Sequence, residues 1–150
     1  SLIKDEPLIL ITANGMSIKF DSNEITPTSR TTSGVKGINL ADGDYIVAAL
    51  PVRDSNDKLA IFSQGGLAKK IELSELPTQK RAGKGLICYK VANTTGLVAA
   101  ACLVSDTDNI LVLGEKSSIC ISASDLPNLG RVPVGNQIIK NTRINSVSKV

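Results

Sequence analysis

The chain repeats one pattern, in which an apolar, strand-like stretch runs into a short polar turn. The stretches that open the three copies begin at Leu8, Leu59 and Ile110, which are spaced 51 positions apart. The first two end in Asn14-Gly15 and Gly65-Gly66, and such pairs are strong signals of a tight β-hairpin turn. A second strand follows each turn, and it holds Lys19-Phe20 in the first copy, Lys70-Ile71 in the second and Ser118–Ser122 in the third.

The remainder of each copy predicts two more strands. A polar loop leads to the aligned glycines Gly37, Gly85 and Gly135, and a short strand is expected to start after each of them. The last strands are expected at 45–52, 97–104 and 144–150, and single helical turns at 73–76 and 124–127. Four short strands in about 50 residues are typical of a propeller blade. The sequence therefore predicts an all-β, propeller-like domain of three four-stranded blades, at about 7–57, 58–106 and 107–150.

The predicted number of blades is small for this architecture, because closed propellers generally have four or more. We therefore expect residues 1–150 to form a single domain that is a partial ring. Three arrangements satisfy this expectation: the chain is a fragment of a larger subunit, two copies of it complete one ring as a homodimer, or the ring stays open. An open ring leaves an unpaired strand edge, which tends to pair with other chains.

Charge is distributed unevenly along the chain. The formal net charge is +3, but residues 1–57 carry −3, residues 58–90 carry +5 and residues 91–150 carry +1. The basic middle third favours a polyanionic ligand at one face. The alternative interpretation is a solvated surface rich in lysine. Because the chain has only two Tyr and two Phe residues and no Trp, we expect any nucleic acid to be held by its phosphates and not by base stacking.

The composition argues against an enzyme. The chain has no histidine, no Cys-x-x-Cys pair and no P-loop, which excludes most zinc sites and the Ser-His-Asp and Cys-His systems. We therefore expect no catalytic residue, no metal and no cofactor in this domain. Cys88, Cys102 and Cys120 are expected to be buried, reduced thiols, and Tyr45 and Tyr89 to be packing residues. No apolar stretch approaches the roughly 18 residues that a membrane helix needs.

A heptapeptide in the second copy resembles a motif of a known family. Gln79-Lys80-Arg81-Ala82-Gly83-Lys84-Gly85 fits the Gln-Arg/Lys-Arg-Gly-Gly-Lys-Gly box of the DNA gyrase A C-terminal domain, with Ala82 in place of a glycine. In the first copy, residues 30–38 followed by 42–44 resemble the Arg-x-Thr-x-Gly-Val-x-Gly-Ile and Gly-Asp pattern of other blades in that family. Because the heptapeptide lies in register with the three-fold repeat, the resemblance covers essentially the whole chain.

This resemblance, to the C-terminal domains of the A subunits of gyrase and topoisomerase IV, implies a β-pinwheel in which neighbouring blades exchange a strand. It implies that a basic outer rim binds duplex DNA without sequence specificity and bends or wraps it, in support of supercoiling. The implied partners are the remainder of the A subunit, together with the ATPase B subunit. The catalytic residues are then outside this chain, and the location is the bacterial cytoplasm near the nucleoid. Two alternatives stay open: a topoisomerase IV-like domain that steers substrate choice without strong wrapping, and a protein-interaction propeller.

The heptapeptide supplies most of the predicted DNA contacts. Its arginine can fork onto a phosphate, its two lysines can act as mobile point charges, and its glutamine can donate a hydrogen bond. Its glycines allow the close backbone approach that a phosphate needs. The candidate contacts in this loop are Gln79, Lys80, Arg81, Gly83, Lys84 and Gly85.

Further DNA contacts are predicted from the second strands and from the other loops. Lys69 and Lys70 are adjacent in a strand and should point to opposite faces. Lys70 aligns with Lys19 at the same 51-residue spacing, so Lys70 is expected to join the main phosphate contact. The weaker candidates, by their position in loops, are Arg30, Lys36 and Arg131.

Overall fold

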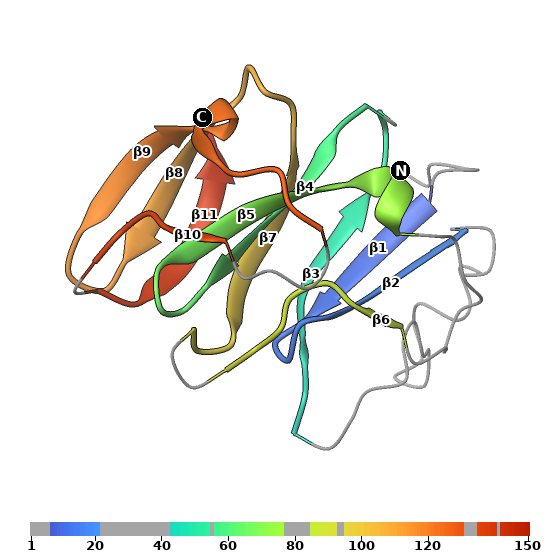
Figure 1. The fold of residues 1–150 in the computed structure, drawn as a ribbon, viewed down its shortest axis with the longest axis horizontal. Helices are drawn as coiled ribbons and strands as arrows, with labels where there is room; N and C mark the ends of the chain where they lie inside the picture. The colour runs from blue at the N-terminus through green and yellow to red at the C-terminus, as the bar shows by residue number, and fades with distance from the viewer. Residues whose placement is uncertain are drawn as a thin grey trace, which may run out of the picture.

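The computed structural model describes residues 7–21, 43–54, 56–76, 85–92, 95–130, 135–140 and 142–150. In these ranges the chain forms only strands and two single 3-10 turns, which confirms the predicted all-β class (Figure 1). The first unit holds β1 (Pro7–Thr12), β2 (Met16–Asp21) and β3 (Ile46–Pro51). The second holds β4 (Lys58–Ser63), β5 (Leu67–Glu72), η2 (Leu73–Glu75), β6 (Leu86–Ile87) and β7 (Val98–Val104). The third holds β8 (Asn109–Gly114), β9 (Ser118–Ser122), η3 (Ala123–Asp125), β10 (Asn136–Gln137) and β11 (Ile144–Lys149).

The strands form three antiparallel sheets that stand side by side (Figure 1). The strand order is β3-β1-β2-β6 in the first sheet, β10-β5-β4-β7 in the second and β11-β8-β9 in the third. Each sheet is built on a hairpin of the first two strands of a unit, as the turn signals predict. In the first two hairpins, Gly15 and Gly66 close the turn with φ of 85° and 92°, in the left-handed region that favours glycine.

Successive units exchange a strand. The third strand of the second unit, β6, pairs with β2 of the first unit, where Leu86 lies opposite Ser17. In the same way β10 of the third unit pairs with β5 of the second, where Asn136 lies opposite Ala68. The pinwheel exchange that the resemblance implies is therefore confirmed. Among the described residues the third sheet has three strands and not the predicted four, because the fourth strand of each complete sheet comes from the unit that follows it in sequence.

The sheets pack face to face, so the middle sheet is buried on both sides. In β4, Leu59 and Ile61 join an apolar core shared with the first sheet, while Ala60 and Phe62 join a core shared with the third. Strands buried on both faces usually read as nearly continuous apolar runs, and this explains the apolar run at residues 59–62 of β4. Burial of both cores holds the three units together as neighbours, since a single sheet cannot bury its own faces.

Candidate nucleic-acid interface

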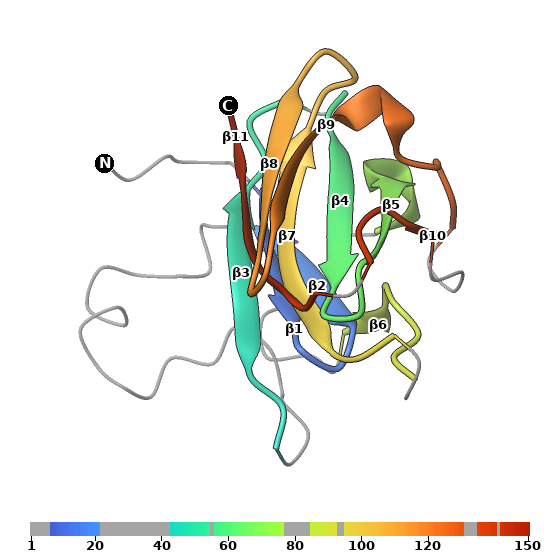
Figure 2. The same cartoon turned by 90° about the vertical axis from the view of Figure 1, so that its left-hand side faces the viewer.

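Two of the predicted DNA-binding loops precede, in sequence, strands at one edge of the stacked sheets. Strand β7 packs against both β3 and β11, so these three strands form the inner edge. Figure 2 shows β6, β5 and β10 on the opposite side from β3 and β11. Strands β6 and β10, which the units exchange, thus form the outer edge, and the loops at 77–84 and 131–134 lead directly into them. These loops lie outside the described residues.

Most of the predicted contacts therefore lie outside the described residues and stay predictions. They are Gln79, Lys80, Arg81, Gly83 and Lys84 of the heptapeptide, together with Arg30, Lys36 and Arg131. Gly85 is described, and it precedes β6 with φ of 81°. Gly135 precedes β10 with φ of 91°, so both loops rejoin the outer edge in the same left-handed conformation.

Two basic residues that the sequence analysis did not single out lie at this outer edge. Lys90 and Lys140 are both exposed, and each follows an exchanged strand by three residues. Each also comes five positions after an aligned glycine, Gly85 or Gly135, which is the signal that would have found them. The exchange places one lysine beside each of two successive sheets, and a repeated row of positive charge is suited to a polyanion.

Each of these lysines is preceded by a buried residue that rests on a hairpin glycine of the previous sheet. Tyr89 and Ile139 are 0% and 6% exposed. A side chain added to Gly15 would overlap the carbonyl oxygen of Tyr89, and one added to Gly66 would overlap that of Ile139. The backbone N–H groups of Cys88 and Tyr89 donate to the Gly15 carbonyl at 2.8 and 3.1 Å, and that of Ile138 donates to the Gly66 carbonyl at 2.8 Å. The backbone that precedes each outer-edge lysine is therefore held against a hairpin turn by hydrogen bonds and close packing.

Lys69 lies in the core between the first and second sheets. Its side chain is 0% exposed, its Nζ donates to the carbonyl oxygen of Gly130 at 2.8 Å, and it lies 5.4 Å from the ring centroid of Tyr89. The hydrogen bond and the ring face compensate part of the cost of burying an ammonium group. Burial lowers the pKa of Lys69 to about 8, against the opposing influence of Cys88 and Glu75.

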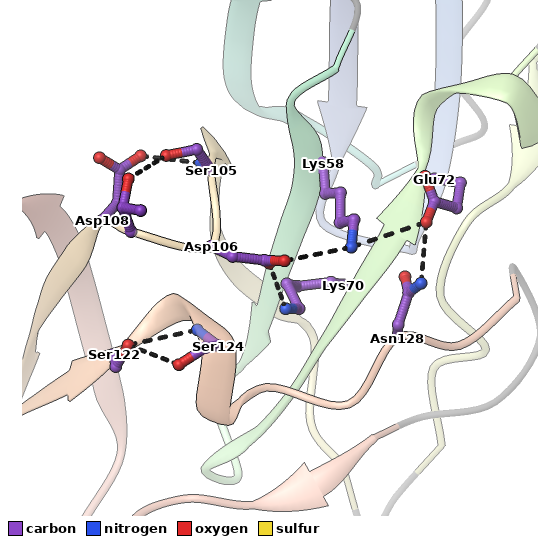
Figure 3. Close-up of polar contacts among 10 residues, drawn as sticks. Lys58, Lys70, Glu72, Ser105, Asp106, Asp108, Ser122, Ser124 and Asn128 are labelled. Carbon is purple, nitrogen blue, oxygen red and sulfur yellow. Dashed lines mark hydrogen bonds and ion pairs between the residues drawn. The ribbon is translucent and has the colours of Figure 1, made fainter.

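Lys70 lies at the other seam, between the second and third sheets (Figure 3). Its side chain is almost fully buried, and its Nζ lies 2.9 Å from Oδ1 of Asp106. The second carboxylate oxygen of Asp106 lies 3.7 Å from Nζ of Lys58, which lies 3.7 Å from Glu72. Asn128 completes the chain of contacts by donating to Glu72 at 2.8 Å. The hydrogen bond from Lys70, followed by the positive charges of Lys70 and Lys58, lowers the pKa of the Asp106 carboxyl.

The opposite-face prediction for the adjacent lysines is thus confirmed, but their surroundings correct the expected role. Lys70 does not lie on an exposed surface, because Asp106 and the third sheet cover it, and Lys69 is also enclosed. Both amines are held by groups of the protein itself. Lys19 is half-buried on β2, opposite Ile9, and its contact with DNA stays a prediction.

The remaining sequence predictions can be compared with the described part of the chain. In that part no group of three His, Cys, Asp or Glu side chains could hold a metal ion, and no helix has the length and apolar character to cross a membrane. Cys88 is buried as expected, whereas Cys102 is half-buried and Cys120 is exposed. Tyr89 is a packing residue as predicted, but Tyr45 is 49% exposed because it precedes β3 at a sheet end.

Comparison with known proteins identifies the class to which this fold and edge belong. Residues 6–53 and 57–102 match the family model of the DNA gyrase C-terminal domain, described as a β-propeller. The chain therefore belongs to the DNA gyrase C-terminal domain family. It is 37% identical over 137 residues to the DNA gyrase A protein of Lawsonia intracellularis and 33% identical over 134 residues to that of Helicobacter pylori. These alignments cover 89% and 88% of the chain but only 17% and 16% of the two relatives.

Solved structures agree with this assignment. The gyrase A C-terminal domain superimposes with a TM-score of 0.89 at 32% identity, over 99% of this chain and 52% of that one. The C-terminal domain of topoisomerase IV superimposes with a TM-score of 0.90 at 29% identity, over 97% of this chain and 46% of that one. The chain thus spans about half of these solved domains and about a sixth of the full-length relatives.

Proposed function

We propose that the chain binds duplex DNA through its phosphates along the outer edge formed by β6 and β10, and that it bends the duplex there. The observation that carries the proposal is the repeat of an exposed lysine, Lys90 and then Lys140, beside the exchanged strand of two successive sheets. Lys80, Arg81 and Lys84 precede the same edge in sequence and add three charges. Phosphate contacts carry no sequence information, so the binding is non-specific.

In this proposal the chain is an accessory domain of the A subunit of a type IIA topoisomerase in the bacterial cytoplasm. DNA cleavage belongs to the remainder of the A subunit, while ATP hydrolysis belongs to an ATPase B subunit. Bending a site of 20–30 base pairs costs on the order of a few kcal/mol, which the contacts along the edge offset. The similarity to the topoisomerase IV domain favours a second role, in which the edge holds DNA and steers substrate choice without strong wrapping.

The primary test is a fluorescence anisotropy titration with a random-sequence duplex of about 40 base pairs at several salt concentrations. Five phosphate contacts predict a slope of log K against log salt of about −4.5. The Lys80/Arg81/Lys84 triple alanine variant should reduce the magnitude of this slope by about 2.7. The Lys90/Lys140 double alanine variant should reduce it by about 1.8. These titrations use the full-length protein of which the chain is a part.

Lys149→Ala is the matched control for Lys90→Ala, because each removes one positive charge. Lys149 lies on β11, at the inner edge of the third sheet, and pairs with Asp108 at 3.9 Å. The Lys149→Ala variant should leave the slope of log K against log salt unchanged. An affinity that does not depend on salt, or equal effects of the two variants, would contradict the proposal and favour a protein-interaction propeller.

A duplex labelled at both ends separates the two DNA-binding roles. Energy transfer between the end labels rises on binding if the edge bends the duplex. If the chain only holds DNA for steering, the affinity and salt slope persist without a change in end-to-end distance.

A further inference from the structure

The hairpins of the first and second sheets receive an exchanged segment in the same way. Each places a buried glycine directly against a backbone carbonyl of that segment. A Cβ on Gly15 would lie 1.9 Å from the carbonyl oxygen of Tyr89, and one on Gly66 would lie 2.2 Å from that of Ile139. Both distances are shorter than the approach of non-bonded atoms, so any side chain there would displace the segment. We call Gly15 and Gly66 the acceptor glycines.

The third hairpin has a serine at the position of the acceptor glycines. Ser117 comes 51 residues after Gly66, and Gly66 comes 51 residues after Gly15. Ser117 is exposed, whereas both acceptor glycines are buried. Because serine carries the Cβ that the acceptor glycines lack, a donated segment cannot approach Ser117 as closely as the other two segments approach their hairpins.

The third turn is also closed by a different backbone hydrogen bond. In the first two turns the N–H of the acceptor glycine donates to the carbonyl of Thr12 at 3.0 Å or of Ser63 at 3.1 Å. In the third turn the direction is reversed, and the N–H of Gly114 donates to the carbonyl of Ser117 at 2.9 Å. The carbonyls of the acceptor glycines accept N–H groups from the exchanged segments, but the carbonyl of Ser117 is bonded within its own turn.

The third sheet nevertheless presents a strand edge at the matching place. In the second sheet, the exchanged strand β10 pairs with Leu67 and Ala68 of β5. The equivalent residues, 51 positions later, are Ser118 and Ile119 of β9, which is the outer strand of the third sheet among the described residues. An unpaired edge of this kind accepts an extended strand by backbone pairing. Since the chain spans about half of the solved domains, the occupant that the exchange pattern predicts is a strand of a following unit.

We propose that a strand of the following unit pairs with β9 but is not held at the third hairpin, so that this seam opens more readily than the two seams within the chain. The strand pairing alone then joins the third unit to the next one along the outer edge. Opening there alters the angle between these two units, and with it the curvature of the outer edge. The inference does not depend on DNA binding, because it concerns only the contacts between units.

The test is hydrogen exchange, measured by mass spectrometry on the full-length protein. Ser117→Gly removes the Cβ and lets the donated segment approach, so amides at 117–122 should exchange about ten-fold more slowly than in the unmodified protein. Ser118→Gly is the matched control, because it makes the same change one position outside the acceptor position, and it should not slow exchange. If Ser117→Gly leaves exchange at 117–122 unchanged, the inference is overturned, since β9 then takes no strand or holds it without regard to residue 117.

The reverse substitution tests the same contact at a seam that the structure describes. Gly66→Ser gives the second hairpin the residue of the third, so amides at 135–140 should exchange about ten-fold faster, while those at 86–90, held at Gly15, stay unchanged. Gly43→Ser is the control, because Gly43 has φ of 79° but nothing lies within 4 Å of an added Cβ.

Equal exchange at 135–140 in the Gly66→Ser and Gly43→Ser variants would overturn the inference, because the close contact at Gly66 would then not hold the exchanged segment. If Gly66→Ser does not fold, Ser117→Gly decides alone, since Ser117 is exposed and its substitution removes no packed side chain. Salt titrations with DNA are not needed for either result, so failure of this inference and failure of the proposed function are distinguishable.

Discussion

Lys70 and Asp106 form an ion pair with 2.9 Å between Nζ and Oδ1, and this contact ties the second sheet to the turn that opens the third unit. The same carboxylate also faces Lys58, and Glu72 connects Lys58 to Asn128 (Figure 3). Because Asn128 lies between Pro127 and Leu129, whose backbone groups pair with that of Lys70, side chains and backbone hold the same seam. The contacts therefore link strands from two units beyond what apolar burial provides.

The Asp106 carboxylate should make the stability of the protein depend on pH in the acidic range. Its partners lower its pKa from the ordinary value of 3.8. A group with a lowered folded-state pKa contributes stability above its unfolded-state pKa, and that contribution is lost as the pH falls through the folded-state pKa. Urea unfolding at pH 6 and at pH 3 should show a larger loss of stability for the unmodified protein than for Asp106→Asn. Asp125→Asn is the control, because Asp125 is exposed and forms no ion pair within the described residues. Equal acid dependence in all three proteins would contradict the expectation.

Lys69 should produce a pH dependence of stability at the alkaline end. Burial lowers its pKa from 10.5 to about 8, so the folded chain releases a proton that the unfolded chain still holds. Unfolding therefore takes up a proton between these pH values, and stability should rise with pH in this window. The gain between pH 7 and pH 10 is on the order of 2 kcal/mol.

The comparison with Lys69→Met isolates this contribution. The groups that face Lys69 are Tyr89, Cys88 and Glu75, and they are present in both proteins. Burial raises the pKa of Tyr89, so that hydroxyl stays neutral through the window. The difference in unfolding free energy between the two proteins, measured in urea at each pH, should change in favour of the unmodified protein as the pH rises. A constant difference would show that Lys69 does not titrate near pH 8.

Substitution of the hairpin glycines tests how closely the exchanged segments pack against the hairpin turns. Gly15→Ala and Gly66→Ala would place a methyl group on the carbonyl of Tyr89 or Ile139, besides requiring a left-handed alanine. Gly43 is the matched control, because its φ is 79° but nothing lies within 4 Å of an added Cβ. Gly43→Ala should cost about 1–2 kcal/mol from backbone conformation alone. Gly15→Ala and Gly66→Ala should lower the unfolding free energy, measured by urea denaturation, by more than Gly43→Ala does. Equal losses in all three variants would mean that the contacts of Gly15 with Tyr89 and of Gly66 with Ile139 are not tightly packed.

Local sequence patterns predicted the strands well, because alternation and turn chemistry act over a few residues. The second strand of the third unit was placed at Ser118–Ser122, where β9 lies. The sheet to which β6 belongs was not predictable from its own sequence, since two residues carry no pattern that identifies a partner about 70 positions away. The family resemblance supplied that connection.

The burial of Lys69 and Lys70 could not be derived from local sequence either. Adjacent lysines in a strand normally mark an exposed surface, since charged side chains are almost never fully buried unless paired. Here both faces of β5 are covered, by Tyr89 on one side and by the turn at Asp106 on the other. The partners lie 20 and 36 positions away, so only tertiary structure brings them to the amines. Lys90 and Lys140, by contrast, could have been found from the sequence, because each comes five positions after an aligned glycine.

Thiol reactivity tests the outer edge of the third sheet. Cys120 is exposed on β9, whereas Cys88 is buried and burial raises the pKa of Cys102 to about 11. Since the thiolate is the reactive form, a maleimide should label Cys120 first, while Cys88 and Cys102 react only on unfolding. By the 51-residue spacing, a strand donated to this sheet would pair beside Ser118 and Ile119, next to Cys120. The 150-residue chain should therefore label rapidly at Cys120, and a longer protein in which a further unit covers β9 should label slowly at the same site. Mass spectrometry of labelled peptides measures both rates, and equally rapid labelling would show that the edge of β9 stays open in the complete protein.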